Sequence, residues 1–212
     1  MLGHSQGGLL LRNVLQLVDG LKVANFVSMA GIQQGYYGTA VLEHILPNVT
    51  ERALTRILYT RELQDSLSVA NWWHSPFESN VVSAQSTPGC LGVSYLADND
   101  YLPSLNNIRA NNVTAAYKTN FVANVDHLYL FGSPQDGTVV PWISELFGFF
   151  GPNDLSTLIE MEDTPEYVDD TFGLRTLDAL GRLHRTAVPG IEHSQWLHNK
   201  TNFMAHIAPL LY

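Results

Sequence analysis

The stretch Gly3-His4-Ser5-Gln6-Gly7-Gly8 decides how the rest of this sequence is interpreted, because it has the Gly-x-Ser-x-Gly spacing and leads into a helical apolar pattern. In such an elbow a strand turns sharply into a helix, and the serine between them adopts a strained backbone conformation. We expect side chains at Gly3 and Gly7 to clash with this turn. The strain lifts the hydroxyl to where a base and a substrate carbonyl can reach it, so Ser5 is a candidate nucleophile.

The residues after the elbow favour this interpretation over a chance match of a short pattern. Apolar residues at helical spacing predict one buried helix face, formed by Leu11, Val14, Leu15 and Val18. Asp19-Gly20 ends this helix, and residues 23–30 predict a buried strand. Only Met1 and Leu2 precede the elbow. We therefore expect a chain that begins in the middle of a fold, lacks the earlier strands, and is inactive and unstable on its own.

Composition limits the classes of function. The 212 residues suit one large domain, and a hydrophobic content of 45% is enough for a sizeable core. A net charge of -9 with 11 Lys and Arg argues against partners such as nucleic acid or an anionic membrane surface, which need basic patches. The sequence holds no run of 18 apolar residues, so we predict no membrane span. The oligomeric state is left open.

Three Asn-x-Thr triplets give the best indication of compartment. They predict glycosylation at Asn48, Asn112 and Asn199, which favours the secretory route. The lone Cys90 is then either a free buried thiol or one whose partner lies in absent sequence.

The later sequence predicts strands that alternate with helices. We expect strands at 127–131 and 183–188, a helix around 172–180 and a last helix over about 202–210. Residues 35–125 mix aromatic and polar residues, and only 51–70 looks helical, so we interpret this part as a lid-like insertion. The prediction is one domain over 1–212, with a mostly parallel sheet covered by helices on both faces.

A nucleophilic serine needs a base, and the base needs an orienting carboxylate. In open parallel sheets such groups lie in loops at the carboxyl ends of strands. Asp136 follows the 127–131 strand and His193 follows the 183–188 strand, which gives the order Ser, Asp, His of the α/β-hydrolase fold. The alternative interpretation of Asp136, which precedes Gly137, is a simple turn residue.

Seven other histidines compete with His193 for the role of base. His4 is beside the nucleophile, and we expect it to pack or to line the pocket because neighbours on an elbow point apart. The other six fall in the insertion, in strands or near the last helix: His44, His74, His127, His184, His198 and His206. Of the alternative carboxylates, Glu192 is adjacent to His193 and Asp126 precedes its strand.

The chain resembles the palmitoyl-protein thioesterases of the lysosome, and more closely their second branch, over essentially its whole length. The resemblance rests on Gly3-His4-Ser5-Gln6-Gly7-Gly8 with Arg12, on Asn71-Trp72-Trp73-His74-Ser75-Pro76, on Asp136 through Pro141-Trp142, on Phe147-Gly148-Phe149, on Phe172-Gly173-Leu174 and on Gly190-Ile191-Glu192-His193. It implies that Ser5, Asp136 and His193 form a triad that hydrolyses fatty-acyl thioesters without a metal or cofactor. It also implies a lysosomal or secreted location, with the signal peptide lost together with the missing N-terminus.

Some features depart from the family pattern. Ser75 stands where the family usually has Asp, and the first third of the family domain is absent, so the backbone N–H of Gln6 is the one oxyanion donor left. We expect Ile32, Trp72 and Trp73 to contribute to an acyl-chain groove, or else simply to pack the insertion on the domain. The alternative functions are a lipase or carboxylesterase on oxygen esters and a catalytically dead acyl-binding protein.

Overall fold

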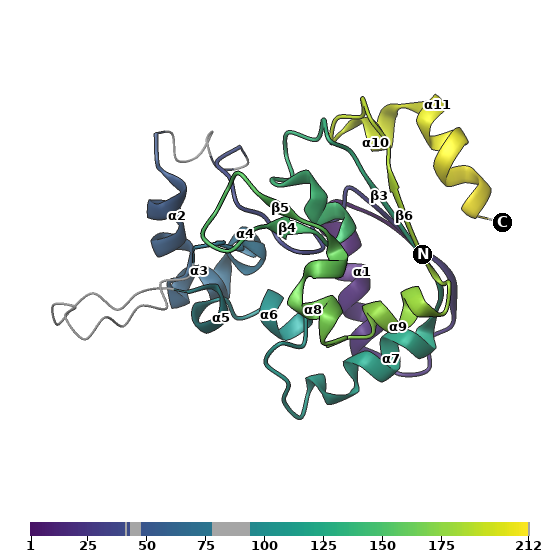
Figure 1. Cartoon of the computed structure of the whole chain (residues 1–212), viewed down its shortest axis with the longest axis horizontal. Coiled ribbons are helices and arrows are strands. Elements are labelled where there is room, and N and C mark those ends of the chain that lie inside the picture. Colours follow the sequence, from purple (N-terminus) through teal and green to yellow (C-terminus); the bar gives the residue numbers. More distant parts are fainter. Residues whose placement is uncertain (41, 43–47, 78–93, 212) are drawn as a thin grey trace, which may run out of the picture.

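A four-stranded parallel sheet is the centre of the computed structural model, which describes residues 1–40, 42, 48–77 and 94–211 (Figure 1). The strands lie in the order β1-β2-β3-β6, and neighbours pair in parallel. Their bounds are β1 (Leu2–His4), β2 (Val23–Met29), β3 (Val125–Gly132) and β6 (Leu183–Ala187). The prediction of a mostly parallel sheet is confirmed, with strand ends within about two residues of those expected.

Helices cover both faces of this sheet. α1 (Gln6–Leu17), α7 (Tyr117–Asn124) and α9 (Leu174–Ala179) lie on one side of the strands, and α10 (Gln195–His198) and α11 (Lys200–Asn202) on the other (Figure 1). The last helix continues as one π-type turn over Phe203–Ile207 and one 3₁₀ turn over Ala208–Leu210. The expected helix over about 202–210 is therefore irregular.

Successive residues of each strand face opposite layers, as the two-residue period of a strand requires. On β2, Phe26 packs with Leu15 and Leu128 in the layer beneath α1, whereas Val27 packs with Trp196 and Ile207 in the layer of the last helices. Both faces of β2 are therefore buried from Phe26 to Met29, as expected for a parallel sheet with helices on both sides.

The buried face of α1 differs from the one predicted. Its buried residues are Gly8, Leu9, Arg12, Leu15 and Gln16, whereas Leu10, Val14, Leu17 and Val18 are 40–52% exposed. The apolar periodicity was misleading because two polar residues point inward. The Arg12 guanidinium lies over the rings of Phe147 and Phe172 and donates to Asn106 Oδ1 and to the Gln33 carbonyl, both at 2.9 Å.

The segment 35–125 has more helices than expected. α2 (Glu51–Leu58), α3 (Arg61–Ser66), α4 (Ser68–Trp72) and α5 (Tyr95–Asp98) form a lobe away from the four-stranded sheet (Figure 1), and α6 (Leu102–Leu105) leads back from it. α7, by contrast, belongs to the sheet layers, because its Asn120 and Asn124 side chains donate to the last carbonyls of α1 at Gln16, Leu15 and Val18. α7 thus satisfies carbonyl groups that the end of a helix leaves without partners.

The remaining elements are short. β4 (Phe149–Phe150) and β5 (Leu158–Ile159) form an antiparallel pair, and α8 (Pro165–Val168) precedes α9. Within the described residues, none of the helices combines the length and the hydropathy that a membrane span requires. Cys90 and His44 lie outside the described residues.

Candidate active site

Ser5 occupies the strained turn that the sequence predicts. It lies between β1 and α1 with φ 55° and ψ -128°, a backbone conformation that non-glycine residues rarely adopt. Its N–H donates to the Met29 carbonyl on β2 (3.0 Å), and its carbonyl accepts from Gly8 N–H (3.0 Å). These two hydrogen bonds with neighbouring backbone hold Ser5 in its strained conformation. That conformation fixes the direction of the hydroxyl.

Two glycines make the elbow possible, and one of them is not the glycine predicted. A Cβ on Gly3 would lie 2.7–2.8 Å from backbone atoms of Gly7 and Gly8, as expected. A Cβ on Gly7 would meet no described atom within 4 Å, so the predicted clash there is wrong. The crowded position is Gly8, where a Cβ would lie 2.5 Å from Ser28 Oγ on β2. The helix packs on the sheet at Gly8, while Gly7 faces open space.

Asp136 and His193 lie in the loops after β3 and β6, at the same edge of the sheet as the elbow. The two loops are joined directly, because Gly190 N–H donates to Gln135 Oε1 (2.6 Å). Asp136 Oδ1 accepts from the N–H groups of Thr138 (2.8 Å) and Val139 (3.0 Å), which orients the carboxylate.

The three candidate side chains form one chain of hydrogen bonds. His193 Nδ1 lies 2.6 Å from Asp136 Oδ2, and His193 Nε2 lies 2.9 Å from Ser5 Oγ. An ionised carboxylate only accepts, so Nδ1 carries the proton and Nε2 is free to accept from the serine hydroxyl. The 2.6 Å contact fits a shared proton rather than a metal ion, whose tetrahedral ligands stand roughly 3 Å apart.

Electrostatics favour an ionised Asp136. Burial raises the pKa of Asp136, but hydrogen bonds from His193, Glu145 and the Val139 N–H outweigh burial, so its pKa lies below the usual value. The neighbouring Glu145 side chain is fully buried, and burial together with the nearby Asp136 charge raises its pKa well above the usual value. Glu145 was not predicted from the sequence, since nothing in its spacing connects it with the elbow.

His4 and Gln6 flank the serine. His4 Nε2 donates to the main-chain carbonyl of His193 (2.9 Å), and the two rings are 4.8 Å apart. Burial lowers the pKa of His4. Gln6 is the first residue of α1, where backbone N–H groups have no acceptor within the helix. Its N–H is therefore a suitable donor for a negatively charged oxygen near Ser5.

The rival residues lie elsewhere. His127 and His184 face each other on β3 and β6, with Nδ1 and Nε2 3.1 Å apart. His198 ends α10, His206 lies beside Phe131 in the last helix, and His74 is half-buried within the insertion, between the rings of Tyr95 and Phe149. Within the described residues, Ser5, His193 and Asp136 are the candidates joined in a Ser–His–carboxylate series of hydrogen bonds, and their catalytic roles stay a prediction.

Comparison with known proteins shows the family of this chain. Residues 1–193 match the model of the family described as palmitoyl protein thioesterase. The chain belongs to this family. It is also 35% identical over 209 residues to proteins named Lysosomal thioesterase PPT2 from Rattus norvegicus and Homo sapiens, which covers 98% of the chain and 64% of each relative. A protein named Palmitoyl-protein thioesterase 1 from Caenorhabditis elegans is 32% identical over 92% of the chain and 60% of its own length.

Membership in the palmitoyl protein thioesterase family confirms the predicted α/β-hydrolase class of fold, with its mostly parallel sheet and helices on both faces. The chain spans less than two thirds of the length of these relatives. Activity, substrate and location are therefore proposals for this family member and are argued below.

The residues predicted to line an acyl-chain groove lie in the core. Ile32, Trp72 and Trp73 are 3%, 8% and 0% exposed, and the Trp73 indole donates to Thr55 Oγ1 (3.0 Å). The Trp73 ring packs against Tyr37. This placement favours the packing alternative, and contact with a substrate stays a prediction for these three side chains.

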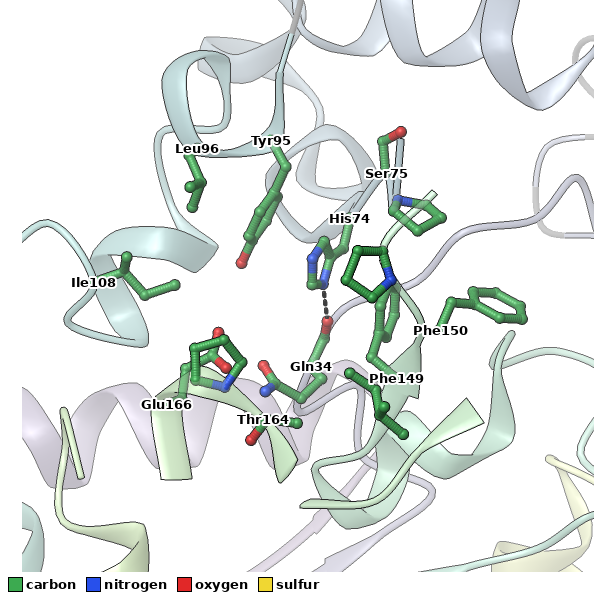
Figure 2. Close-up of a pocket in the computed structure, with 14 residues that line it drawn as sticks. Gln34, His74, Ser75, Tyr95, Leu96, Ile108, Phe149, Phe150, Thr164 and Glu166 are labelled. Carbon is green, nitrogen blue, oxygen red and sulfur yellow. Dashed lines mark hydrogen bonds between the residues drawn. The ribbon is translucent and has the colours of Figure 1, made fainter. Parts of the chain in front are cut away.

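A mainly apolar cavity of about 250 Å³ opens next to them, around His74 (Figure 2). The His74 ring stacks between Tyr95 (3.7 Å) and Phe149 (3.9 Å), and Nδ1 donates to the Gln34 carbonyl (2.6 Å). A second hollow, of about 270 Å³, lies beside His193 and Glu192. Neither Trp72 nor Trp73 lines these two cavities.

The predicted glycosylation acceptors are accessible to different degrees. Asn48 and Asn112 are exposed. Asn199 is half-buried, and its Oδ1 accepts from Asn202 N–H at the start of α11 (3.0 Å). Glycosylation uses the amide nitrogen, so this cap leaves the reactive atom of Asn199 unused.

Proposed function

We propose that this protein is a serine hydrolase that cleaves long-chain fatty-acyl thioesters, of the palmitoyl-CoA or palmitoyl-protein type. The observation that carries the proposal is the hydrogen-bonded series Ser5, His193, Asp136 at an elbow of suitable geometry. Membership in the thioesterase family supports the choice of substrate. The names of the relatives point to the same reaction.

The proposed reaction has two steps. In the first, His193 Nε2 takes the proton of Ser5 as its Oγ attacks the thioester carbonyl, and the Gln6 N–H binds the developing oxyanion. The carbon–sulfur bond then breaks, the thiol leaves with the proton from His193, and an acyl-enzyme remains. In the second step, His193 activates a water that attacks the acyl-serine and releases the fatty acid. Asp136 stabilises the imidazolium in both steps.

We propose a lysosomal or secreted location for this reaction. The relatives named lysosomal thioesterases support this assignment, as do the exposed acceptors Asn48 and Asn112. Digestion of the secreted protein with a glycosidase, followed by mass spectrometry of peptides that hold these asparagines, tests the location independently of catalysis.

Two measurements on the intact protein test the proposed activity. A fluorophosphonate should label Ser5 covalently, because only an activated serine reacts with it. Palmitoyl-CoA should then be hydrolysed with a higher kcat/KM than an oxygen ester of the same acyl chain. Labelling without a preference for the thioester would favour a lipase or carboxylesterase. No labelling of folded protein would favour an acyl-binding protein without catalytic activity.

A further inference from the structure

Glu145 places a second carboxyl group behind the proposed triad. It lies in the 3₁₀ turn Trp142–Leu146, and its side chain is fully buried. Gly132, at the end of β3, leaves room for it, since a Cβ there would lie 2.7 Å from Glu145 Oε2. The Ser133 N–H donates to the same oxygen (2.9 Å). One carboxylate oxygen of Glu145 is therefore held by the backbone that leads to Asp136.

The other oxygen of Glu145 has no hydrogen-bond donor among the residues that the structure describes. Oε1 is buried and receives no hydrogen bond from the described protein groups. One ligand atom each of Glu145, Asp136 and His193 lies within 4.8 Å of the others. A buried charged oxygen without a donor is costly, whereas a protonated Glu145 carboxyl group can donate to the nearby Asp136 carboxylate.

Two carboxyl groups this close and this deeply buried cannot both be ionised at low cost. The donors around them decide which one holds the proton. Asp136 accepts from the Thr138 and Val139 N–H groups and from His193 Nδ1, whereas the one donor to Glu145 among the described groups is Ser133 N–H. The three donors stabilise the charge on Asp136, so the proton belongs on Glu145.

We propose that Glu145 is a positioning residue that stays protonated and donates a hydrogen bond through Oε1 to the Asp136 carboxylate. Its role in hydrolysis rests on the function proposed above. The titratable groups that face it among the described residues are Asp136 directly and His193 beyond it. Neutral groups beside it include Gly132, Ser133 and the adjacent Ser144, which is itself bonded to Gln34 and Gly35.

This arrangement adjusts how strongly Asp136 holds a protonated His193. A donor on Asp136 withdraws negative charge from it and weakens its attraction for the imidazolium. Loss of the donor should favour the protonated, inactive form of His193 and move the acid limb of the pH profile to higher pH by roughly one unit. An ionised Glu145 would act in the opposite sense, because its removal would take a negative charge away from His193.

Infrared spectroscopy of the intact protein tests the protonation state without any turnover. The wild-type minus Glu145→Gln difference spectrum at neutral pH should contain the carbonyl stretch of a protonated carboxylic acid. A difference spectrum with carboxylate bands alone would overturn the proposal. A failure of thioester hydrolysis would leave this result intact, so the two proposals fail separately.

The pH dependence of fluorophosphonate labelling at Ser5 tests the positioning role of Glu145. Glu145→Gln keeps a donor toward Asp136 and should keep the acid limb in place, whereas Glu145→Leu should raise it. A downward shift in Glu145→Gln, or identical limbs in all three proteins, would contradict the role. If Glu145→Leu does not fold, the Glu145→Gln profile and the infrared band still decide.

Discussion

His4 donates a hydrogen bond from Nε2 to the main-chain carbonyl of His193, at 2.9 Å. The two residues belong to β1 and to the loop after β6, which are separated in the sheet by β2 and β3. The loop that carries His193 must therefore cross the edge of the sheet to reach Ser5. His4, which ends β1 and precedes Ser5, holds the loop there. The residue that positions the proposed base is therefore the chain neighbour of the nucleophile.

Replacing His4 should reduce the reactivity of Ser5 without unfolding the protein. His4→Leu removes the donor to the His193 carbonyl, and we expect Ser5 labelling by a fluorophosphonate to slow by about tenfold, as for loss of one hydrogen bond worth roughly 1.4 kcal/mol. His4→Gln is the control, because its amide nitrogen can donate to the same carbonyl. Equal rates in His4→Leu and wild type would show that the bond does not position His193.

The elbow predicts opposite outcomes for two adjacent glycines. Gly8→Ala should cost about 1–3 kcal/mol of unfolding free energy, because its Cβ would press on Ser28 Oγ, which is itself fixed by a hydrogen bond from Gln33. Gly7→Ala should be neutral or slightly stabilising, because its Cβ points into open space and alanine favours helices. Urea unfolding of both variants makes the comparison.

A double variant identifies the cause of the Gly8 effect. Ser28→Ala removes the crowded oxygen, so Gly8→Ala should cost less in that background than in the wild type. Equal losses for Gly7→Ala and Gly8→Ala would contradict the packing described at the elbow.

His74 should make the protein less stable in acid. Burial lowers its pKa from 6.5 to about 4, and the neutral ring donates to Gln34. Between these two values the unfolded chain binds a proton that the folded protein does not, so stability is complete above pH 6.5 and falls as the pH drops toward 4. At roughly 1.4 kcal/mol per pH unit, the loss should reach about 3 kcal/mol.

The His74→Gln variant provides the comparison for this effect, because it cannot titrate but can still donate. Urea unfolding at several pH values between 6.5 and 4 should show a shallower decline for the variant than for the wild type. Parallel declines in the two proteins would mean that His74 is already protonated in the fold or does not contribute.

The sequence carried enough information for the sheet and for the placement of the candidate site. β1, β3 and β6 end in loops or turns with the Ser, Asp and His candidates, so the rule for parallel sheets places those side chains at one edge. Gly3 was correctly assigned to the sharp turn. These features depend on local sequence and on a general rule of topology.

Features that depend on packing between distant segments were not predictable. The Arg12 and Gln16 side chains point from α1 into the protein core. Their hydrogen-bond partners, at Asn106, Gln33 and Leu105, are brought near only by the fold. α7 lacks an apolar stripe because its asparagines bind carbonyls of α1. Glu145 lies in a 3₁₀ turn and Asp136 in the loop after β3, and nothing in the sequence pattern pairs them. Only the close approach of Glu145 to Gly132 in the fold shows that they are neighbours.

The most direct test of the central claim is to trap the acyl-enzyme. The intact protein is mixed with palmitoyl-CoA, quenched in acid before steady state, digested and examined by mass spectrometry. We expect a palmitoyl group on the peptide that holds Ser5, its loss in Ser5→Ala, and almost no thioester hydrolysis in that variant. A palmitoyl group on another residue such as Cys90, or wild-type turnover by folded Ser5→Ala protein, would contradict the account.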